Sequence, residues 1–217
     1  MKIAILGTGM VGETLATKLV ALGHEVRMGS RTADNERATA WAARAGDRAG
    51  HGRFADVVVD AELVFLCTLG TAALDVLAAV GEEALAGKIV VDTTNPLDFS
   101  RGFPPSLFVS GSDSLGEQIQ RAHPRARIVK ALNTISAPVM VDPRSLPGEH
   151  LSFVAGNDPE ARSKVAGLLT EGFGWPRVLD LGDITGARGT EAYLLLWLRL
   201  YGALQSPLFN IQLVTAK

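Results

Sequence analysis

The chain has 217 residues, which is enough for one α/β domain with a sizeable core. Apolar residues make up 47% and charged residues 20%, and a formal net charge of −2 argues against a general attraction to nucleic acid. The single cysteine, Cys67, permits no internal disulfide and fits a reducing compartment. The sequence opens on an apolar run without a signal-peptide pattern, so we expect a cytoplasmic protein with no membrane or nucleic-acid partner.

Strand and helix patterns alternate along the first half of the chain. Short apolar runs predict buried parallel strands over Lys2–Leu6, His24–Gly29, Leu63–Leu69 and Lys88–Asp92. Helical periodicity predicts helices over Met10–Leu22, Glu36–Ala45, Val57–Ala61 and Ala72–Val80.

The alternation of strands and helices is interrupted at residues 96–112. The prolines, glycines and serines of this segment predict a long loop, and long loops often have a function. The alternation then resumes with predicted helices over Asp113–Ala122 and Pro159–Glu171 and predicted strands over Arg127–Leu132, Leu151–Ala155 and Arg177–Leu181. Asp158 is the expected N-cap of the second helix. A terminal helix is expected to begin near residues 186–190.

This alternation predicts an α/β fold, a Rossmann doubly wound and mostly parallel sheet with a short C-terminal helical extension. The one plausible boundary lies near Gly182, which divides a Rossmann domain (residues 1–182) from a helical segment (residues 183–217). The run Ala192–Leu204 contains Arg199 and is too short to span a membrane. We therefore expect a helix buried on most of its faces, which covers the cleft and contacts a second subunit in a homodimer.

Three glycines form a phosphate-binding pattern between the first strand and the first helix. The segment Gly7-Thr8-Gly9-Met10-Val11-Gly12 matches G-x-G-x-x-G in the context that a dinucleotide site requires. Gly7 would permit the tight turn, Gly9 would admit the pyrophosphate, and Gly12 would let helix and strand pack closely. The helix N-terminus would then face the phosphates.

The end of the second strand indicates which dinucleotide is bound. NAD-selective sites place a carboxylate there, whereas this chain has Ser30, Arg31 and Thr32. An arginine and two hydroxyls suit the 2′-phosphate of NADP(H), and Arg37 could approach from the next helix. Asp34 follows the arginine and is not expected to hold the ribose.

Polar residues follow three further strands. The amides and hydroxyls among them suit a carboxamide, a ribose or a ring edge, although Asn, Thr and Ser also serve turns. The expected cleft lining comprises Thr68, Leu69, Asn95, Asn133, Thr134, Ile135 and Ser136. Of these, Asn133, Thr134 and Ser136 are candidates for a direct part in the reaction.

No His–Asp pair, catalytic lysine motif or metal-ligand cluster accompanies these residues. Lys130 lies in an apolar strand and either is a base with a lowered pKa or, as we expect, reaches out from an outer strand end. Asp92 is expected to cap neighbouring backbone, Cys67 to pack as a small hydrophobe, and the four histidines to lie at the surface. A carbonyl reductase needs a proton donor, whereas exchange between two carriers needs mainly aligned rings.

The segments GTGMVG, LGHEVRMGSR, VDTTNPLDF, IVKALNTI and WLRLYGAL resemble the NADP oxidoreductases that depend on coenzyme F420, a deazaflavin. The resemblance spans essentially the whole chain. It implies NADP(H) on the Rossmann fold, a deazaflavin stacked against the nicotinamide, hydride transfer without a protein acid or base, and a homodimer. It assigns Gly7 to Gly12 to the pyrophosphate and Ser30 with Arg31 to the 2′-phosphate. Asn35 and Asn133 depart from it, standing where archaeal members have a basic residue and a histidine.

Three functions follow from these patterns. The first is hydride exchange between NADP(H) and coenzyme F420 or a flavin. The second is NADPH-dependent reduction of a small carbonyl or imine, with Ser136, Lys130 or a partner-subunit residue as proton donor. The third is a non-catalytic NADP-binding sensor.

Overall fold

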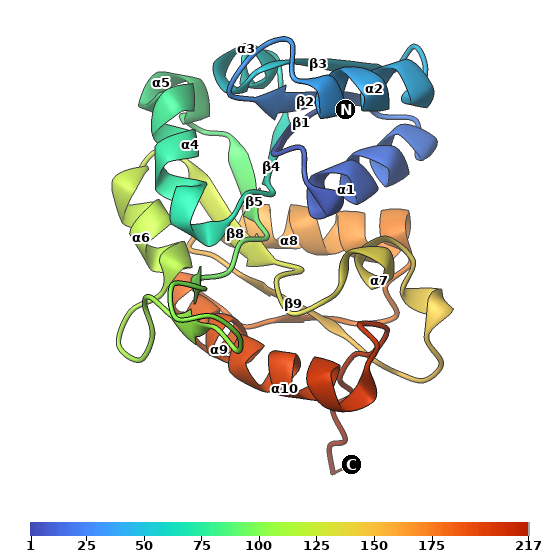
Figure 1. Cartoon of the computed structure of the whole chain (residues 1–217), viewed down its shortest axis with the longest axis vertical. Coiled ribbons are helices and arrows are strands. Elements are labelled where there is room, and N and C mark those ends of the chain that lie inside the picture. The colour runs from blue at the N-terminus through green and yellow to red at the C-terminus, as the bar shows by residue number, and fades with distance from the viewer. Residues whose placement is uncertain (217) are drawn as a thin grey trace.

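A computed structural model describes residues 1–216 and has an eight-stranded sheet at its centre (Figure 1). Six parallel strands follow the Rossmann order β3-β2-β1-β4-β5-β8. They are β1 (Lys2–Leu6), β2 (Glu25–Ser30), β3 (Ala49–Arg53), β4 (Leu63–Leu66), β5 (Ile89–Asp92) and β8 (Arg127–Ala131). Beyond them β9 (Ser152–Ala155) pairs antiparallel with β8, and β10 (Val178–Asp180) pairs parallel with β9. The predicted doubly wound fold is therefore confirmed.

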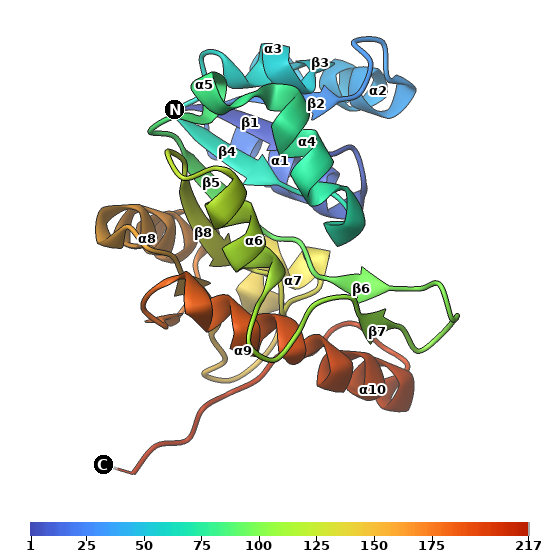
Figure 2. The same cartoon turned by 90° about the vertical axis from the view of Figure 1, so that its left-hand side faces the viewer.

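Helices cover both faces of the sheet. One face carries α1 (Met10–Ala21), α2 (Glu36–Ala45), α7 (Ala137–Val141) and α8 (Pro159–Gly167). The other carries α3 (Phe54–Val58), α4 (Ala73–Val80), α5 (Glu82–Leu85), α6 (Leu115–Ala122) and the start of α9 (Ala187–Ala192). The last helix, α10 (Leu194–Leu204), continues from α9, and beside it projects a small hairpin of β6 (Leu97–Asp98) and β7 (Ser106–Leu107) (Figure 2).

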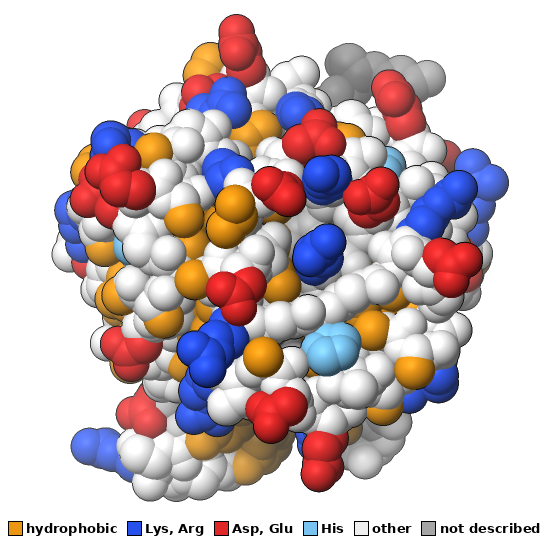
Figure 3. Space-filling model, turned by 90° about the horizontal axis from the view of Figure 1, so that it is seen from above, with side chains coloured by type: hydrophobic (Ala, Val, Ile, Leu, Met, Phe, Trp, Pro, Cys, Tyr) orange, Lys and Arg blue, Asp and Glu red, His pale blue; other side chains and the backbone are white. Residues whose placement is uncertain are grey.

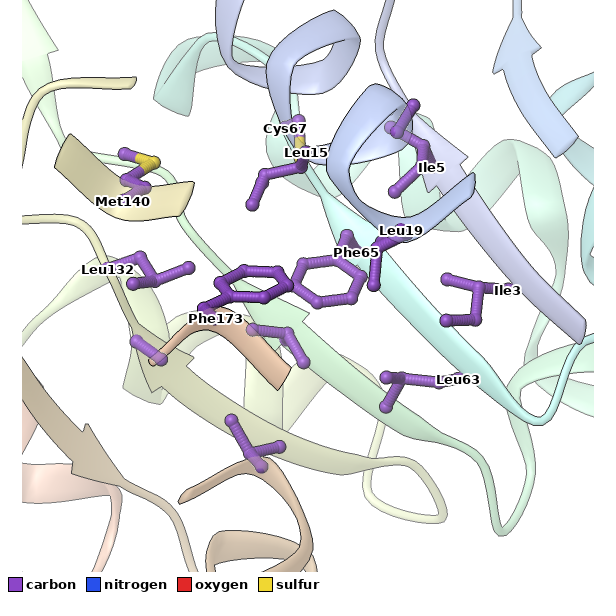
Figure 4. Packing of buried hydrophobic residues seen from close by; sticks show 14 of the residues in the cluster. Ile3, Ile5, Leu15, Leu19, Leu63, Phe65, Cys67, Leu132, Met140 and Phe173 are labelled. Carbon is purple, nitrogen blue, oxygen red and sulfur yellow. The ribbon is translucent and has the colours of Figure 1, made fainter. Parts of the chain in front are cut away.

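Each face of the sheet has its own apolar core. Alternating strand residues supply both, because successive side chains of a strand point to opposite faces. In the core on the α1 side, the rings of Phe65 from β4 and Phe173 from the segment after α8 lie next to each other, with Leu15 and Leu19 of α1 nearby (Figure 4). Trp41 of α2 is buried there too, and its Nε1 donates to Thr17 Oγ1 of α1 at 3.1 Å.

Several local predictions were wrong, for identifiable reasons. The sequence AGHGR of β3 has no large apolar residue, yet the segment pairs along β2 as an edge strand through its backbone. The predicted helix Val57–Ala61 begins earlier, at Phe54. The predicted loop at 96–112 contains the β6–β7 hairpin, and the helix predicted to run to Glu171 leaves α geometry after Gly167 and continues as a π-helical segment, Leu168–Phe173. Asp158 caps α8 as expected, accepting from Ala161 N at 2.8 Å.

Much of the terminal helix α10 is exposed in the single chain. Only Leu194 and Leu198 are buried, whereas Leu195 is 47% exposed, Leu196 55% and Leu204 56%. Burial of the remaining apolar side against a second subunit stays a prediction, because the core of one chain covers only part of the helix. Within residues 1–216, no helix combines the length and apolarity that crossing a membrane would require.

Candidate functional site

The turn between β1 and α1 has the geometry of a phosphate cradle. Gly7 has φ of +126°, and a Cβ there would collide with the backbone carbonyl of Cys67. A Cβ on Gly12 would likewise collide with the Gly7 carbonyl. At Gly9, by contrast, a Cβ would meet nothing within 4 Å. Two glycines are thus required by the fold itself, while Gly9 leaves open space at the N-terminus of α1, where the helix dipole favours an anion.

This cradle lies where the chain reverses its winding direction. From β1 the chain passes through α1 on one face, whereas from β4 it passes through α4 on the other. Ligands of doubly wound sheets bind at this switch point, outside the carboxyl ends of the strands. The exits of β1 and β4 touch here, at Gly7 and Cys67.

The end of β2 presents a basic loop. Ser30 is buried and its hydroxyl donates to the Thr32 carbonyl, so the hydroxyl helps to shape the loop. Arg31 is exposed and forms no ion pair with any described residue. Asn35 caps α2 by accepting from Ala38 N at 3.1 Å, which explains a polar residue at that position.

Strand β3 adds two residues that the sequence did not place near this loop. His51 Nδ1 lies 2.9 Å from the Ala33 carbonyl, and Arg53 stands opposite Ser30 in the parallel register. Neither could be inferred without recognising β3. At this end of the molecule basic and acidic side chains are interspersed, with no extended region of one charge (Figure 3).

The exits of β5 and β8 are joined by a reciprocal pair of amides. Asn95 Nδ2 donates to the Asn133 carbonyl at 2.8 Å, and Asn133 Nδ2 donates to Asn95 Oδ1 at 2.9 Å. Leu132, which precedes Asn133, has a φ of 63°. A left-handed leucine is costly and is most often found where function fixes the backbone.

Two hydroxyls, one in the segment after β4 and one in the segment after β8, lack partners among the described residues. Thr68 Oγ1 and Ser136 Oγ are buried and form no hydrogen bond with the described residues. Buried polar atoms are normally satisfied, so such atoms suit a ligand that supplies the missing group. Thr134 and Ile135 are buried, whereas Leu69 is 74% exposed beside Thr68. An open groove of about 580 Å³ begins at Met10 but follows α1 toward Val141 and Asp142 of the α7 side, away from this predicted lining.

Residues 2–96 match the family described as NADP oxidoreductase, coenzyme F420-dependent. The F420-dependent NADP reductase of Methanothermobacter marburgensis is 30% identical over 202 residues, covering 88% of each chain. The chain belongs to this family of F420-dependent NADP oxidoreductases.

Other relatives extend the comparison. A crystal structure of a candidate F420-dependent NADP-reductase from Arthrobacter sp. FB24 superposes with a TM-score of 0.94 and 48% identity, covering 99% of this oxidoreductase and 100% of that chain. Metalloreductase STEAP3 of Rattus norvegicus is 30% identical over 193 residues, and the present chain spans 36% of its length. A reductive aminase from Aspergillus terreus, 23% identical with a TM-score of 0.66 over 94% of this chain and 62% of its own, shares the fold.

In this oxidoreductase the surroundings of Lys130, near the strand exits, differ from those expected from the sequence. Lys130 does not reach out to solvent. It is fully buried, and its Nζ lies 2.7 Å from Asp92 Oδ2. Burial disfavours the ammonium, but Asp92 and Glu191 outweigh this effect and raise the pKa of Lys130 above its ordinary value. Lys130 is therefore a bound cation and no base.

The remaining candidate acids and bases are also accounted for. Asp92 caps backbone as predicted, because Oδ1 accepts from Thr94 N at 2.9 Å and from Thr94 Oγ1 at 2.6 Å. Cys67 is buried, and burial raises the pKa of its thiol to about 12. The expectation of four surface histidines is wrong for His123 and His150, which are buried in the tightly turned connections that follow α6 and precede β9.

Proposed function

We propose that this chain exchanges hydride between NADP(H) and coenzyme F420 or a flavin-type carrier. The observation that carries the proposal is the pairing of a phosphate cradle with polar strand exits at which Lys130 and Asp92 are bound to each other. Exchange between two carriers needs orientation of their rings more than a protein acid. NADP(H), when bound, supplies the hydride chemistry.

The chain's own residues would bind and orient the two carriers. Gly7, Thr8, Gly9, Met10, Val11 and Gly12 would hold the pyrophosphate, and Ser30, Arg31 and Thr32 the 2′-phosphate. Thr68, Leu69, Asn95, Asn133 and Thr134 would line the nicotinamide end. Exposed Leu69 offers an apolar surface for a ring, while the Asn95–Asn133 pair and the Thr68 hydroxyl provide polar anchors.

Stopped-flow oxidation of enzyme-bound NADPH tests this function directly. Mixing with coenzyme F420, with FMN and with a panel of small carbonyls and imines should give rapid oxidation by one of the ring carriers. Asn133→Leu should slow that phase, while Arg27→Ala, an exposed change on β2, serves as a matched control. Oxidation by neither carrier would refute the exchange mechanism.

A second candidate function is reduction of a small carbonyl or imine. The observation in its favour is the unpartnered hydroxyl of Ser136, which could donate to a substrate oxygen or nitrogen. Oxidation of NADPH by the carbonyl or imine panel alone, with loss of the rate in Ser136→Ala, would support it.

Arg31→Ala is expected to weaken NADPH binding by about 1.5–3 kcal/mol, the range for hydrogen bonds to charged groups. NADH affinity should stay nearly unchanged, because NADH lacks the 2′-phosphate that the exposed guanidinium would bind. Calorimetric titration of both nucleotides measures the difference. Equal losses for the two would show that Arg31 does not read the 2′-phosphate.

The exposed face of α10 leads us to expect a homodimer. Leu195, Leu196, Tyr201 and Leu204 are each at least 40% exposed on this helix, and a monomer rarely leaves such a patch uncovered. Analytical ultracentrifugation at micromolar concentration should show a dimer that Leu196→Lys dissociates. A wild-type monomer would contradict the expectation.

A further inference from the structure

Lys130 is the centre of a buried charge cluster that joins three parts of the fold. Its Nζ lies 2.7 Å from Asp92 Oδ2 at the end of β5 and 2.7 Å from Glu191 Oε1 of α9. It also donates to the Thr94 carbonyl at 2.9 Å. None of the three charged side chains is more than 2% exposed.

Each charged side chain of this cluster is in an ion pair, and most of the carboxylate oxygens also accept hydrogen bonds. Glu191 Oε2 accepts from Leu115 N at 2.8 Å, and Oε1 accepts from Gly116 N at 2.9 Å, both in the first turn of α6. Asp92 Oδ1 accepts from Thr94, while Oδ2 has the ion pair with Lys130 as its contact. Three of the four carboxylate oxygens accept hydrogen bonds, and Asp92 Oδ2 has only its 2.7 Å ion pair with Lys130, so the geometry places two carboxylates around one ammonium.

Such a cluster contributes little net free energy to the stability of a fold compared with apolar packing. Desolvation of buried charges cancels much of their attraction, and apolar side chains of similar volume often stabilise equally well. What such a cluster does provide is a fixed arrangement, since each ion pair and each charged hydrogen bond constrains both of its partners.

The cluster is connected to the amide pair at the exits of β5 and β8. Thr94, held by Lys130 through its carbonyl, is followed by Asn95, and Asn95 exchanges two hydrogen bonds with Asn133. Lys130 itself lies three residues before Asn133, separated from it by the left-handed Leu132. The cluster thus ties together the two chain segments that carry the amide pair.

Gly116 shows that α9 must approach closely for this to happen. A Cβ at that position would lie 2.9 Å from Ala187 Cβ and 3.3 Å from Lys130 Cε. The lack of a side chain lets Glu191 reach both the α6 amides and the lysine.

We propose that Lys130, Asp92 and Glu191 form a positioning cluster that fixes the Asn95–Asn133 pair for hydride transfer and makes its position depend on the docking of α9. The inference rests on the proposed function, because it assumes that this amide pair lines the reacting end of the cleft. None of the three residues is expected to touch a substrate.

Glu191→Gln is the informative variant, and Arg188→Ala is its matched control. Arg188 also joins α9 to α6, through Nε to Glu117 Oε2 at 2.8 Å, but it has no contact with Lys130 among its hydrogen bonds and ion pairs. Glu191→Gln weakens the contact of α9 with the lysine, whereas Arg188→Ala removes a contact between α9 and α6 that lies outside the cluster.

We expect Glu191→Gln to slow single-turnover hydride transfer at saturating carrier by about 10- to 100-fold, the range for a small misplacement of reacting groups. Affinity for 2′,5′-ADP, which occupies only the distant phosphate end, should change less than about twofold, whereas NADPH affinity should fall. Arg188→Ala should lower the melting temperature and leave the rate unchanged.

Two further measurements keep the inference falsifiable. If Glu191→Gln folds poorly, Asp92→Asn at the end of β5 serves in its place. This change retains an acceptor for Thr94 and should slow hydride transfer in the same way. In an Asn133→Ala background the effect of Glu191→Gln should shrink, because residues acting through one another are not additive.

The outcomes separate this inference from the proposed function. A wild-type enzyme that transfers hydride, together with equal rates for Glu191→Gln and Arg188→Ala, would overturn the positioning role alone. A wild-type enzyme inactive with every carrier would refute the function. The ratio of NADPH to 2′,5′-ADP affinity in Glu191→Gln would then still test the cluster, and an unchanged ratio would overturn it.

Discussion

Gly9→Val is expected to weaken NADPH binding more than about a hundredfold while the protein stays folded. The open space above Gly9 accommodates a side chain without a clash in the free protein, but that space is where the pyrophosphate would approach. Loss of two hydrogen bonds to a charged phosphate, at about 1.5–3 kcal/mol each, accounts for the size of the effect. Calorimetry measures the affinity for NADPH, and thermal unfolding of the free protein measures whether the variant stays folded.

Gly7→Ala provides the contrasting control. Gly7 has a φ of +126° and its Cβ would collide with the Cys67 carbonyl, so this change should destabilise the fold by more than about 1 kcal/mol. Unaltered NADPH affinity in Gly9→Val would show that the glycine loop is only a turn.

Lys130→Met is expected to lower the free energy of unfolding by about 3–5 kcal/mol, because it leaves Asp92 and Glu191 buried without their cation. Urea denaturation measures the loss. A triple change that also makes Asp92→Asn and Glu191→Gln removes the stranded charges and should recover much of the stability. A loss below about 1 kcal/mol, the range of a surface pair, would contradict the charge pairing.

The pH dependence follows from the raised pKa of Lys130. A cation whose pKa is higher in the folded state contributes fully below its unfolded value, near 10.5, and its contribution fades as pH rises through the folded value. The wild-type protein should therefore lose the stability that this cation contributes only in strongly alkaline solution, as urea denaturation over a range of pH would show.

Sequence patterns identified the parts of the fold that local chemistry determines. Apolar runs located β1, β4 and β5, and glycine spacing located the turn at Gly7, because each signal lies within a few adjacent residues. Strand β3 escaped recognition since an edge strand can be built from backbone pairing alone. The nucleotide-binding and cleft roles assigned to individual residues remain predictions.

Lys130 shows why the charge cluster could not be predicted. An isolated lysine in an apolar strand is compatible with a perturbed base, a solvated end or an ion pair, and only its partners decide between them. Those partners are Asp92 and Glu191, which come from β5 and α9, and nothing local in the sequence signals that they meet. The composition of α10 indicated an apolar side that one core face could not bury, but composition alone does not say which partner covers it.

The antiparallel pairing of β9 decides from which edge the C-terminal segment departs. Because β9 and β10 run antiparallel to the other six strands, β10 ends on the side of the sheet where the parallel strands begin. The chain then returns through α9 toward the carboxyl ends of those strands and brings Glu191 to Lys130. The residues after β10 thus leave the sheet once and reach the exits of β5 and β8, where we propose the second carrier to bind, without passing the phosphate cradle. Chimeras that exchange residues 183–216 between family members should therefore transfer carrier preference while the parent's discrimination between NADPH and NADH is retained.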